Sequence, residues 1–269
     1  MMQAQQLFDR LWAGYTTQNP EALSIFNLFV KEGETVVNDH IAFRTFNDKR
    51  INIDILAKPF ITAGYLYKDS YKFEDKHLFA RHYEHPDLPD APRVFISELI
   101  AENFSDTLQS CITSLTGKIS KALLDSDELL FSGNTWGTPS YDLYQKLRSE
   151  SEYAAWVYVY GFRANHFTVS INALKKYDTI EKVNQLLKDS GFLLNDAGGE
   201  IKGTPSELLE QSSTRAGILP VAFQEGIFEI PSCYYEFARR YPDSAGKLYS
   251  GFIAKSADKI FESTDFYKK

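Results

Sequence analysis

Residues 38–46 read NDHIAFRTF, a run in which polar or small residues alternate with apolar ones, as is typical of a half-buried strand. Successive side chains of a strand point to opposite faces. His40, Ala42 and Arg44 would therefore share one face, and the apolar residues between them would take the other. The small side chain of Ala42 leaves room beside the two ionisable groups, which a metal ion with exchangeable ligands needs.

A second stretch resembles the first. Residues 165–172 read NHFTVSIN and also begin with a polar residue followed by a histidine, His166. After nearly the same interval, each stretch leads through a helical pattern to a glycine followed by an aromatic residue, at Gly64 and at Gly191. The two stretches are therefore interpreted as equivalent strands of an internal repeat.

Both halves of this repeat finish with strands that carry a glutamate, Glu98 in FISEL and Glu236 in YYEFA. A strand, a helix and several further strands, occurring twice, predict an α+β fold. We expect two βαβββ-like modules that form a cupped mixed sheet, with N-terminal and connecting helices packed outside it.

The chain is long enough to form one domain with a substantial core. We expect a single domain over 1–269, with helices in 1–34, the first module and a connecting helix in 35–131, and the second module with a C-terminal extension in 152–269. Between the modules, SGNTWGTPSYDLY at 132–144 is rich in Gly, Pro, Ser and Asn and predicts a loop, and the module boundary is expected near 132–152.

The pattern of apolar residues predicts the individual elements. Helices are expected at 3–18, 20–32, 51–64, 105–124 and 177–192, with Pro59 shortening or kinking the third and Asp178 capping the last. Further strands are expected at 77–83, 93–100, 154–160, 218–223 and 233–240.

Composition excludes some functions. The formal net charge is −7 and no dense cluster of Lys and Arg occurs, which argues against a nucleic-acid surface. Cys111 and Cys233 are far apart and are expected to be free thiols of a reducing compartment. The first residues lack the pattern of a secretory signal, and no apolar run of about 18 residues occurs. We therefore expect a cytoplasmic protein that does not span a membrane.

Three ionisable residues on three expected strands form a candidate metal site: His40, His166 and Glu236. Two imidazoles and one carboxylate are the facial triad of non-haem Fe(II) enzymes, and the same set can bind catalytic zinc. A lone histidine in a strand is more often structural, and Glu236 could instead pair with Arg239 or Arg240. His40 and His166 occupy equivalent positions of the repeat, which makes each of them a better candidate for a metal ligand than a lone histidine would be.

Two alternatives to this ligand set are open. Glu229 in IFEIPS is a rival third ligand, although Pro231 places it near a sheet edge or turn. The other histidines, His77, His82 and His85, crowd one stretch, and the odd spacing of the first two puts them on opposite faces of a strand. This stretch is interpreted as a solvated hairpin, and a role near the pocket rim is the alternative.

Four motifs together resemble the 2-oxoadipate dioxygenase/decarboxylase family, a divergent relative of the vicinal oxygen chelate proteins with their paired βαβββ modules. These motifs are NDHIAFRTF, ANHFTVSIN, EIPSCYYEFARR and GFIAKSADKIFEST, and the resemblance extends from about residue 35 to the C-terminus. It implies that His40, His166 and Glu236 hold the metal, that Arg44 grips a substrate carboxylate, and that Ser256 contacts the substrate.

The resemblance also implies an activity. An Fe(II)-dependent enzyme would convert 2-oxoadipate and O2 to 2-hydroxyglutarate and CO2, in lysine breakdown. Lys255 stands where longer family members have an apolar residue, so the exact 2-oxo acid stays open. Two other functions stay open as well: a zinc or other divalent-metal hydrolase or glyoxalase-like isomerase, and a non-catalytic ligand-binding protein.

Overall fold

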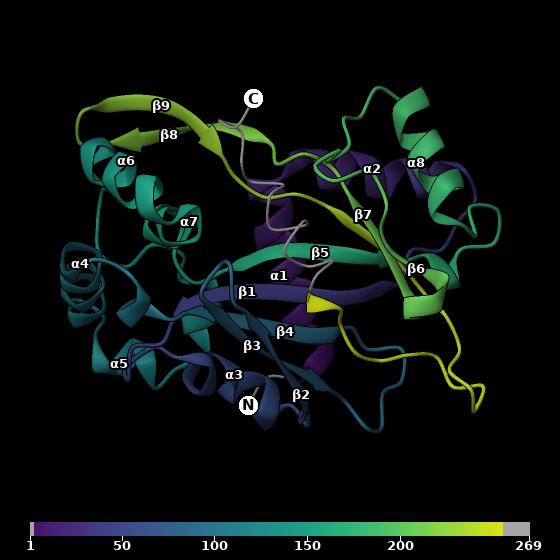
Figure 1. The fold of residues 1–269 in the computed structure, drawn as a ribbon, viewed down its shortest axis with the longest axis horizontal. Helices are drawn as coiled ribbons and strands as arrows, with labels where there is room; N and C mark the ends of the chain where they lie inside the picture. Colours follow the sequence, from purple (N-terminus) through teal and green to yellow (C-terminus); the bar gives the residue numbers. More distant parts are fainter. Residues whose placement is uncertain (1–2, 255–269) are drawn as a thin grey trace.

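A computed structural model describes residues 3–254 and has an α+β architecture built around one curled, eight-stranded mixed sheet (Figure 1). Its strand order is β2-β3-β4-β1-β5-β10-β7-β6. The chain begins with two helices, α1 (Ala4–Gln18) and α2 (Pro20–Lys31). Among residues 3–254, no helix is long and apolar enough to cross a bilayer.

Each half of the sheet is one βαβββ module. The first module comprises β1 (Asn38–Phe46), α3 (Ile53–Thr62), β2 (Leu66–Phe73), β3 (Leu78–Glu84) and β4 (Arg93–Leu99). The second comprises β5 (Ala164–Ser170), α8 (Ile180–Asp189), β6 (Lys202–Thr204), β7 (Leu209–Ser213) and β10 (Glu236–Arg240). In each module the first strand pairs parallel with the last, and β1 pairs antiparallel with β5 where the modules meet.

Other elements connect or extend the modules. Between them lie α4 (Asp106–Gly117), α5 (Lys121–Leu124), α6 (Tyr141–Glu150) and α7 (Glu152–Tyr160). The second module carries an inserted hairpin, β8 (Ile218–Phe223) and β9 (Gly226–Pro231), which arches past α6 (Figure 1). There the rings of Tyr141 and Phe228 stack with centroids 3.7 Å apart.

Side chains alternate along these strands, so that one set faces the hydrophobic core and the other faces the candidate site. Phe43, Phe167 and Phe237 are buried and contact rings from α3, α1 and α2, respectively. The residues between them therefore project from the opposite face of the sheet. The predicted fold class is confirmed, while the division of the chain into the ranges 1–34, 35–131 and 152–269 stays a prediction.

The prediction of a strand at 154–160 is wrong, because this segment is helix α7. Ser151 caps the helix by accepting a hydrogen bond from the N–H of Ala154, and the helix ends at Gly161. Every residue from 153 to 160 is buried. A helix that is apolar all round shows no helical period, and its aromatic and β-branched residues are typical of strands.

Several element bounds also differ. The strand expected at 233–240 begins only at Glu236, the helix expected at 105–124 is divided into α4 and α5, and the cap of α8 is Thr179 rather than Asp178. Helix α6, which begins at Tyr141, replaces the end of the loop expected at 132–144. Strands β2 and β7 were not predicted: β2 is an edge strand with mostly exposed residues, and β7 buries the polar run LEQSS.

Candidate metal centre

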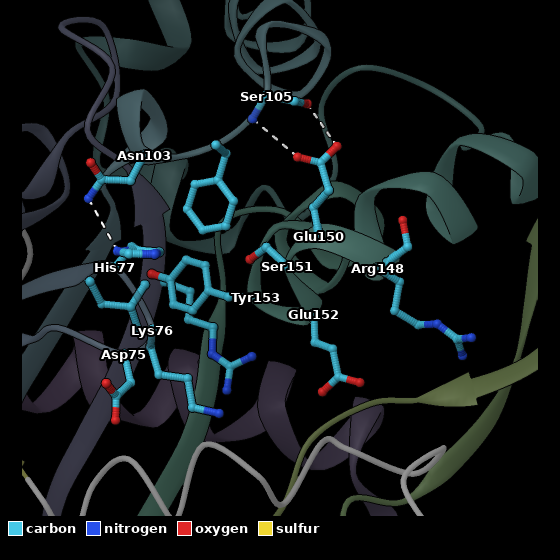
Figure 2. Close-up of a pocket in the computed structure, with 14 residues that line it drawn as sticks. Asp75, Lys76, His77, Asn103, Ser105, Arg148, Glu150, Ser151, Glu152 and Tyr153 are labelled. Carbon is cyan, nitrogen blue, oxygen red and sulfur yellow. Dashed lines mark hydrogen bonds between the residues drawn. The ribbon is translucent and has the colours of Figure 1, made fainter.

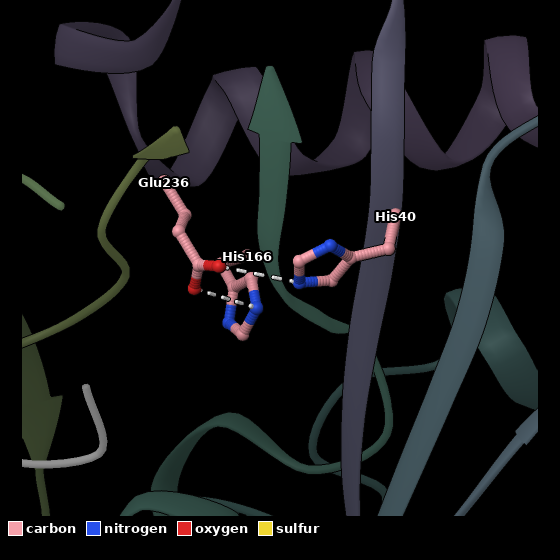
Figure 3. A group of neighbouring side chains, drawn as sticks. All are labelled: His40, His166 and Glu236. Atoms are coloured by element: carbon pink, nitrogen blue, oxygen red, sulfur yellow. Dashed lines mark ion pairs between the residues drawn. The ribbon is translucent and has the colours of Figure 1, made fainter. Parts of the chain in front are cut away.

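His40, His166 and Glu236 lie on three adjacent strands, β1, β5 and β10, and converge on one point (Figure 3). All three are buried, and their potential ligand atoms lie within 4.8 Å of one another. The two carboxylate oxygens of Glu236 lie 3.4 Å from Nε2 of His40 and 3.4 Å from Nε2 of His166, respectively. The structure therefore brings together the three residues of the predicted site.

A β-bulge precedes each histidine. In the pairing of β1 with β5, Asp39 is the extra residue on β1, and Asn165 is the extra residue on β5. Bulges turn the local strand and re-aim its side chains. Here each bulge brings the side chain of the preceding residue onto the imidazole that follows it.

Both imidazoles are oriented by these preceding residues. Nδ1 of His40 lies 2.8 Å from a carboxylate oxygen of Asp39, and Nδ1 of His166 lies 3.1 Å from the amide oxygen of Asn165. Because these oxygens can only accept, each Nδ1 carries the proton. Nε2 of each ring is then the atom that carries the lone pair, and it is the atom that faces Glu236.

Asp39 is itself held in place by cations. The Arg240 guanidinium donates two hydrogen bonds to its carboxylate, at 2.7 and 2.8 Å, and Arg93 lies 3.4 Å away. Burial alone would raise the pKa of Asp39, but Arg240 and His40 hold it well below its usual range. A charged Asp39 therefore faces His40, and Arg240 is occupied by Asp39 rather than by Glu236.

Burial sets the charge of the three clustered groups. It lowers the pKa of His40, against the opposing effect of Asp39, and lowers the pKa of His166 further, with help from His40 and Arg44. Burial also raises the pKa of Glu236 to about 8. Burial therefore disfavours the charged form of all three groups, and a bound cation would offset this effect at Glu236.

The donor set fits a divalent cation. Glu236 is 1% exposed, and its one hydrogen-bond donor among the residues described is Gln211, whose amide nitrogen contacts one carboxylate oxygen. A buried carboxylate with two imidazole lone pairs beside it is costly without a positive charge. Three ligands from three strands on one side leave coordination positions open, as catalytic iron and zinc sites require.

Arg44 lies beside this cluster on the same face of β1. Its side chain is 2% exposed, and its guanidinium carbon lies 5.2 Å from the ring centroid of Tyr153 and 5.1 Å from that of Trp156. Both rings belong to α7, the segment for which the sequence pattern predicted a strand. They hold the planar guanidinium in a fixed orientation, which suits recognition of a carboxylate.

Two cavities meet at Arg44. The inner one contains the cluster and has a volume of about 20 Å³, enough for one or two water molecules. The outer one has a volume of about 590 Å³ and is lined by residues of α6, α7 and the β2–β3 turn, including Lys76, Arg148 and Glu152 (Figure 2). Arg44 lines both, so it separates the cluster from the wider pocket.

The other predicted residues lie elsewhere. Glu229 is exposed on the β8–β9 hairpin and is not part of the cluster. Ser256 and Lys255 lie outside the residues that the structure describes. The interpretation of residues 77–85 as a solvated hairpin is wrong for His82, which is 1% exposed because β3 lies inside the sheet and its ring faces the site side.

Sequence reasoning missed the residues that support the ligands: Asp39, Asn165, Thr168 and Gln211. Thr168 lies 3.1 Å from Nε2 of His40, and Gln211 comes from the unpredicted strand β7. A signal for the first two was present, because each ligand histidine directly follows an Asp or Asn. No local pattern marks Gln211, which reaches Glu236 only through the pairing of β7 with β10.

Comparisons with known proteins agree with this arrangement. A family model described as 2-oxoadipate dioxygenase/decarboxylase matches residues 8–245. A protein of Arabidopsis thaliana named 2-oxoadipate dioxygenase/decarboxylase, chloroplastic, is 36% identical over 279 residues, covering 93% of this chain and 74% of the relative.

Two solved structures share the fold. Hydroxyglutarate synthase from Oryza sativa, crystallised in complex with 2-oxoadipate, is 34% identical with a TM-score of 0.90, covering 97% of this chain and 91% of the other. A protein from Shewanella frigidimarina NCIMB 400, provisionally assigned to the hydrolases, is 50% identical with a TM-score of 0.90, covering 94% of this chain and 99% of the other.

Proposed function

Because the chain belongs to the 2-oxoadipate dioxygenase/decarboxylase family of oxidoreductases, we propose that it converts 2-oxoadipate and O2 to 2-hydroxyglutarate and CO2 with a bound Fe(II). The reaction balances without a further reductant: C1 leaves as CO2 with its own two oxygens, one atom of O2 enters the carboxyl group formed at C2, and the other becomes the new hydroxyl group. The observation that carries the proposal is the convergence of His40, His166 and Glu236 beside the buried Arg44.

In this proposal, His40 and His166 bind the metal through Nε2 and Glu236 binds it through its carboxylate. Fe(II), when bound, supplies the redox chemistry that couples O2 to the loss of a carboxyl group from a 2-oxo acid. Asp39 and Asn165 keep the two imidazoles in the tautomer that presents Nε2. Gln211 keeps the carboxylate of Glu236 turned toward them.

Arg44 is proposed to bind a carboxylate of the substrate. A guanidinium can donate two parallel hydrogen bonds to a carboxylate, and Tyr153 and Trp156 restrict its orientation. Its position at the boundary of the two cavities would place a dicarboxylic 2-oxo acid with its reacting end at the cluster. Ser256 is proposed as a further substrate contact, and the pathway as lysine breakdown, on the family resemblance.

The test uses protein loaded anaerobically with Fe(II). We expect O2 uptake with 2-oxoadipate, and equal amounts of CO2 and 2-hydroxyglutarate by mass spectrometry. Glu236→Gln should lose bound iron and turnover, whereas Glu229→Gln, the same change on the exposed hairpin, should lose neither. A folded, iron-loaded protein that is inert toward all dicarboxylic 2-oxo acids tested would contradict the proposal.

Measuring the bound metal would distinguish the proposed dioxygenase from the competing chemistry. The same three ligands suit zinc, and the Shewanella frigidimarina relative is provisionally assigned to the hydrolases. Zinc as the bound metal, together with turnover that is independent of O2, would favour a hydrolase or an isomerase. The cytoplasmic location stays a prediction, since the plant relative is named chloroplastic.

A further inference from the structure

One wall of the inner cavity is a single aromatic side chain from the C-terminal segment. Phe252 is 6% exposed, and its ring lies edge-on to His40 with centroids 4.8 Å apart. It also contacts Phe95 at 4.8 Å and His82 at 5.3 Å. Phe252 thus covers a ligand of the metal site without belonging to any strand of the sheet.

The cavity behind Phe252 is too small for a substrate. Its volume of about 20 Å³ accommodates one or two water molecules, whereas even small-ligand pockets measure about 300 Å³ or more. A 2-oxo acid that binds beside the cluster therefore requires part of the wall to move. Two wall residues, Tyr234 and Phe252, belong to no strand, and of these Tyr234 is fully buried whereas Phe252 is 6% exposed.

A short chain of hydrogen bonds holds Phe252 in place. Its backbone N–H donates to the Tyr71 hydroxyl at 3.1 Å, and this hydroxyl lies 2.9 Å from Nδ1 of the buried His82. Nε2 of His82 lies 3.2 Å from a carboxylate oxygen of Glu84. One tautomer satisfies all of these contacts: Tyr71 donates to Nδ1, and Nε2–H donates to Glu84.

We propose that Phe252 is the movable wall of the metal site, and that Tyr71, oriented by His82, is the positioning residue that keeps this wall closed. Movement of Phe252 away from His40 opens the cluster to a 2-oxo acid, and the Tyr71 hydrogen bond restores the closed wall. Arg240 anchors the base of the segment by donating to the carbonyl of Gly251 at 2.7 Å. Phe252 is the residue that directly follows this anchor.

The first test measures access to the site without relying on metal or activity. Metal-free full-length protein is treated with diethyl pyrocarbonate, and the labelling rates of His40, His166 and His77 are measured by peptide mass spectrometry. We expect Phe252→Ala to increase labelling of His40 and His166 by about tenfold or more. Tyr71→Phe, which removes the hydrogen bond from the Phe252 N–H together with the one to His82, should increase it by about 3- to 10-fold. His77, which lines the outer pocket, should be labelled equally in all variants.

Two controls separate an opened wall from a loosened fold. Tyr67→Phe changes an exposed tyrosine on the same strand β2 and should leave all rates unchanged. Cys233 is 1% exposed in the core and should stay unreactive toward a thiol reagent in every variant. If Phe252→Ala leaves the labelling of His40 at the wild-type rate while Cys233 stays protected, Phe252 is not the wall, and access runs through the outer pocket instead.

A second test uses the proposed reaction, on which the identity of the substrate rests. With 2-oxoadipate, Tyr71→Phe should lower KM by about 3- to 10-fold, because a larger fraction of the protein is then open to substrate, and should change kcat by less than about twofold. Tyr67→Phe should change neither. If Tyr71→Phe and the control Tyr67→Phe lowered kcat by the same factor, the positioning role of Tyr71 would be overturned. If the protein does not catalyse the proposed reaction, the wild type will show no turnover with 2-oxoadipate, whereas the labelling rates can still show that Phe252 covers the site. The two failures are therefore distinguishable.

Discussion

The carboxylate of Asp39 lies 2.8 Å from Nδ1 of His40, the residue that directly follows it in the chain. A bulge in β1 makes this contact between sequence neighbours possible. The contact fixes the ring so that Nε2 faces Glu236. It also links the three candidate ligands to the buried Asp39–Arg240 ion pair. The orientation of one proposed ligand therefore depends on a carboxylate that is not itself one of the three candidate ligands.

Replacing this carboxylate should weaken metal binding. We expect Asp39→Asn to reduce the affinity for Fe(II) or Co(II) by about 10- to 100-fold, as is typical when the partner of a ligand histidine is altered. Isothermal titration calorimetry on the metal-free protein would measure the change. Asp87→Asn, at an exposed position, is the matched control. An unchanged affinity in Asp39→Asn would show that Asp39 has only a structural role.

Substitution of Arg44 should affect substrate binding more than metal binding. Arg44→Lys keeps the charge but loses the planar pair of donors, so KM for 2-oxoadipate should rise by about 10- to 100-fold. Metal content should stay at the wild-type level. Arg215→Lys, which changes an exposed arginine paired with Asp196, should alter neither quantity. A loss of metal together with the rise in KM would place Arg44 among the groups that maintain the cluster.

Stability should depend on pH through Glu84. Burial acts to raise the pKa of this carboxyl group, but His82 and Arg93 lower it to about 2, from 4.5 in the unfolded chain. The charged form is thus favoured by folding, and this stabilisation is present above pH 4.5 and is lost as the pH falls toward 2.

Glu84→Gln removes this contribution. The side chain of Glu84 is 24% exposed, so after allowing for screening by solvent we expect a loss of about 2 kcal/mol in the free energy of unfolding near pH 7. Urea denaturation at several pH values would show the difference from wild type shrinking below pH 4.5. The exposed Glu181, changed to Gln, should show no such trend.

Gly161 is required at the end of α7. Its φ is +65°, and a Cβ added there would lie 2.0 Å from the carbonyl oxygen of Gly133, whose backbone pairs with Phe162. Gly161→Ala should therefore destabilise the protein by more than about 3 kcal/mol. Gly14→Ala lies inside α1 with nothing near its Cβ and should stabilise by about 0.5–1 kcal/mol. Thermal unfolding of both variants would test this pair.

Local patterns in the sequence determined much of this protein. The alternation in NDHIAFRTF and NHFTVSIN specified two strands with apolar faces toward helices and histidines on the other face, and the repeat specified paired βαβββ modules. Strand alternation also put Arg44 on the face of His40. These features were predictable because a strand's period fixes which side chains share a face, whatever the remainder of the chain does.

Tertiary structure decided the features that depend on pairing between distant segments. Helix α7 is buried on all sides, so its sequence could not reveal a helical face, yet its two rings orient Arg44. Glu236 rather than Glu229 joins the histidines because β10 pairs with β5, while Glu229 lies on a hairpin outside the sheet. Register and packing between elements arise from many contacts at long sequence separation, and no short stretch of residues encodes them.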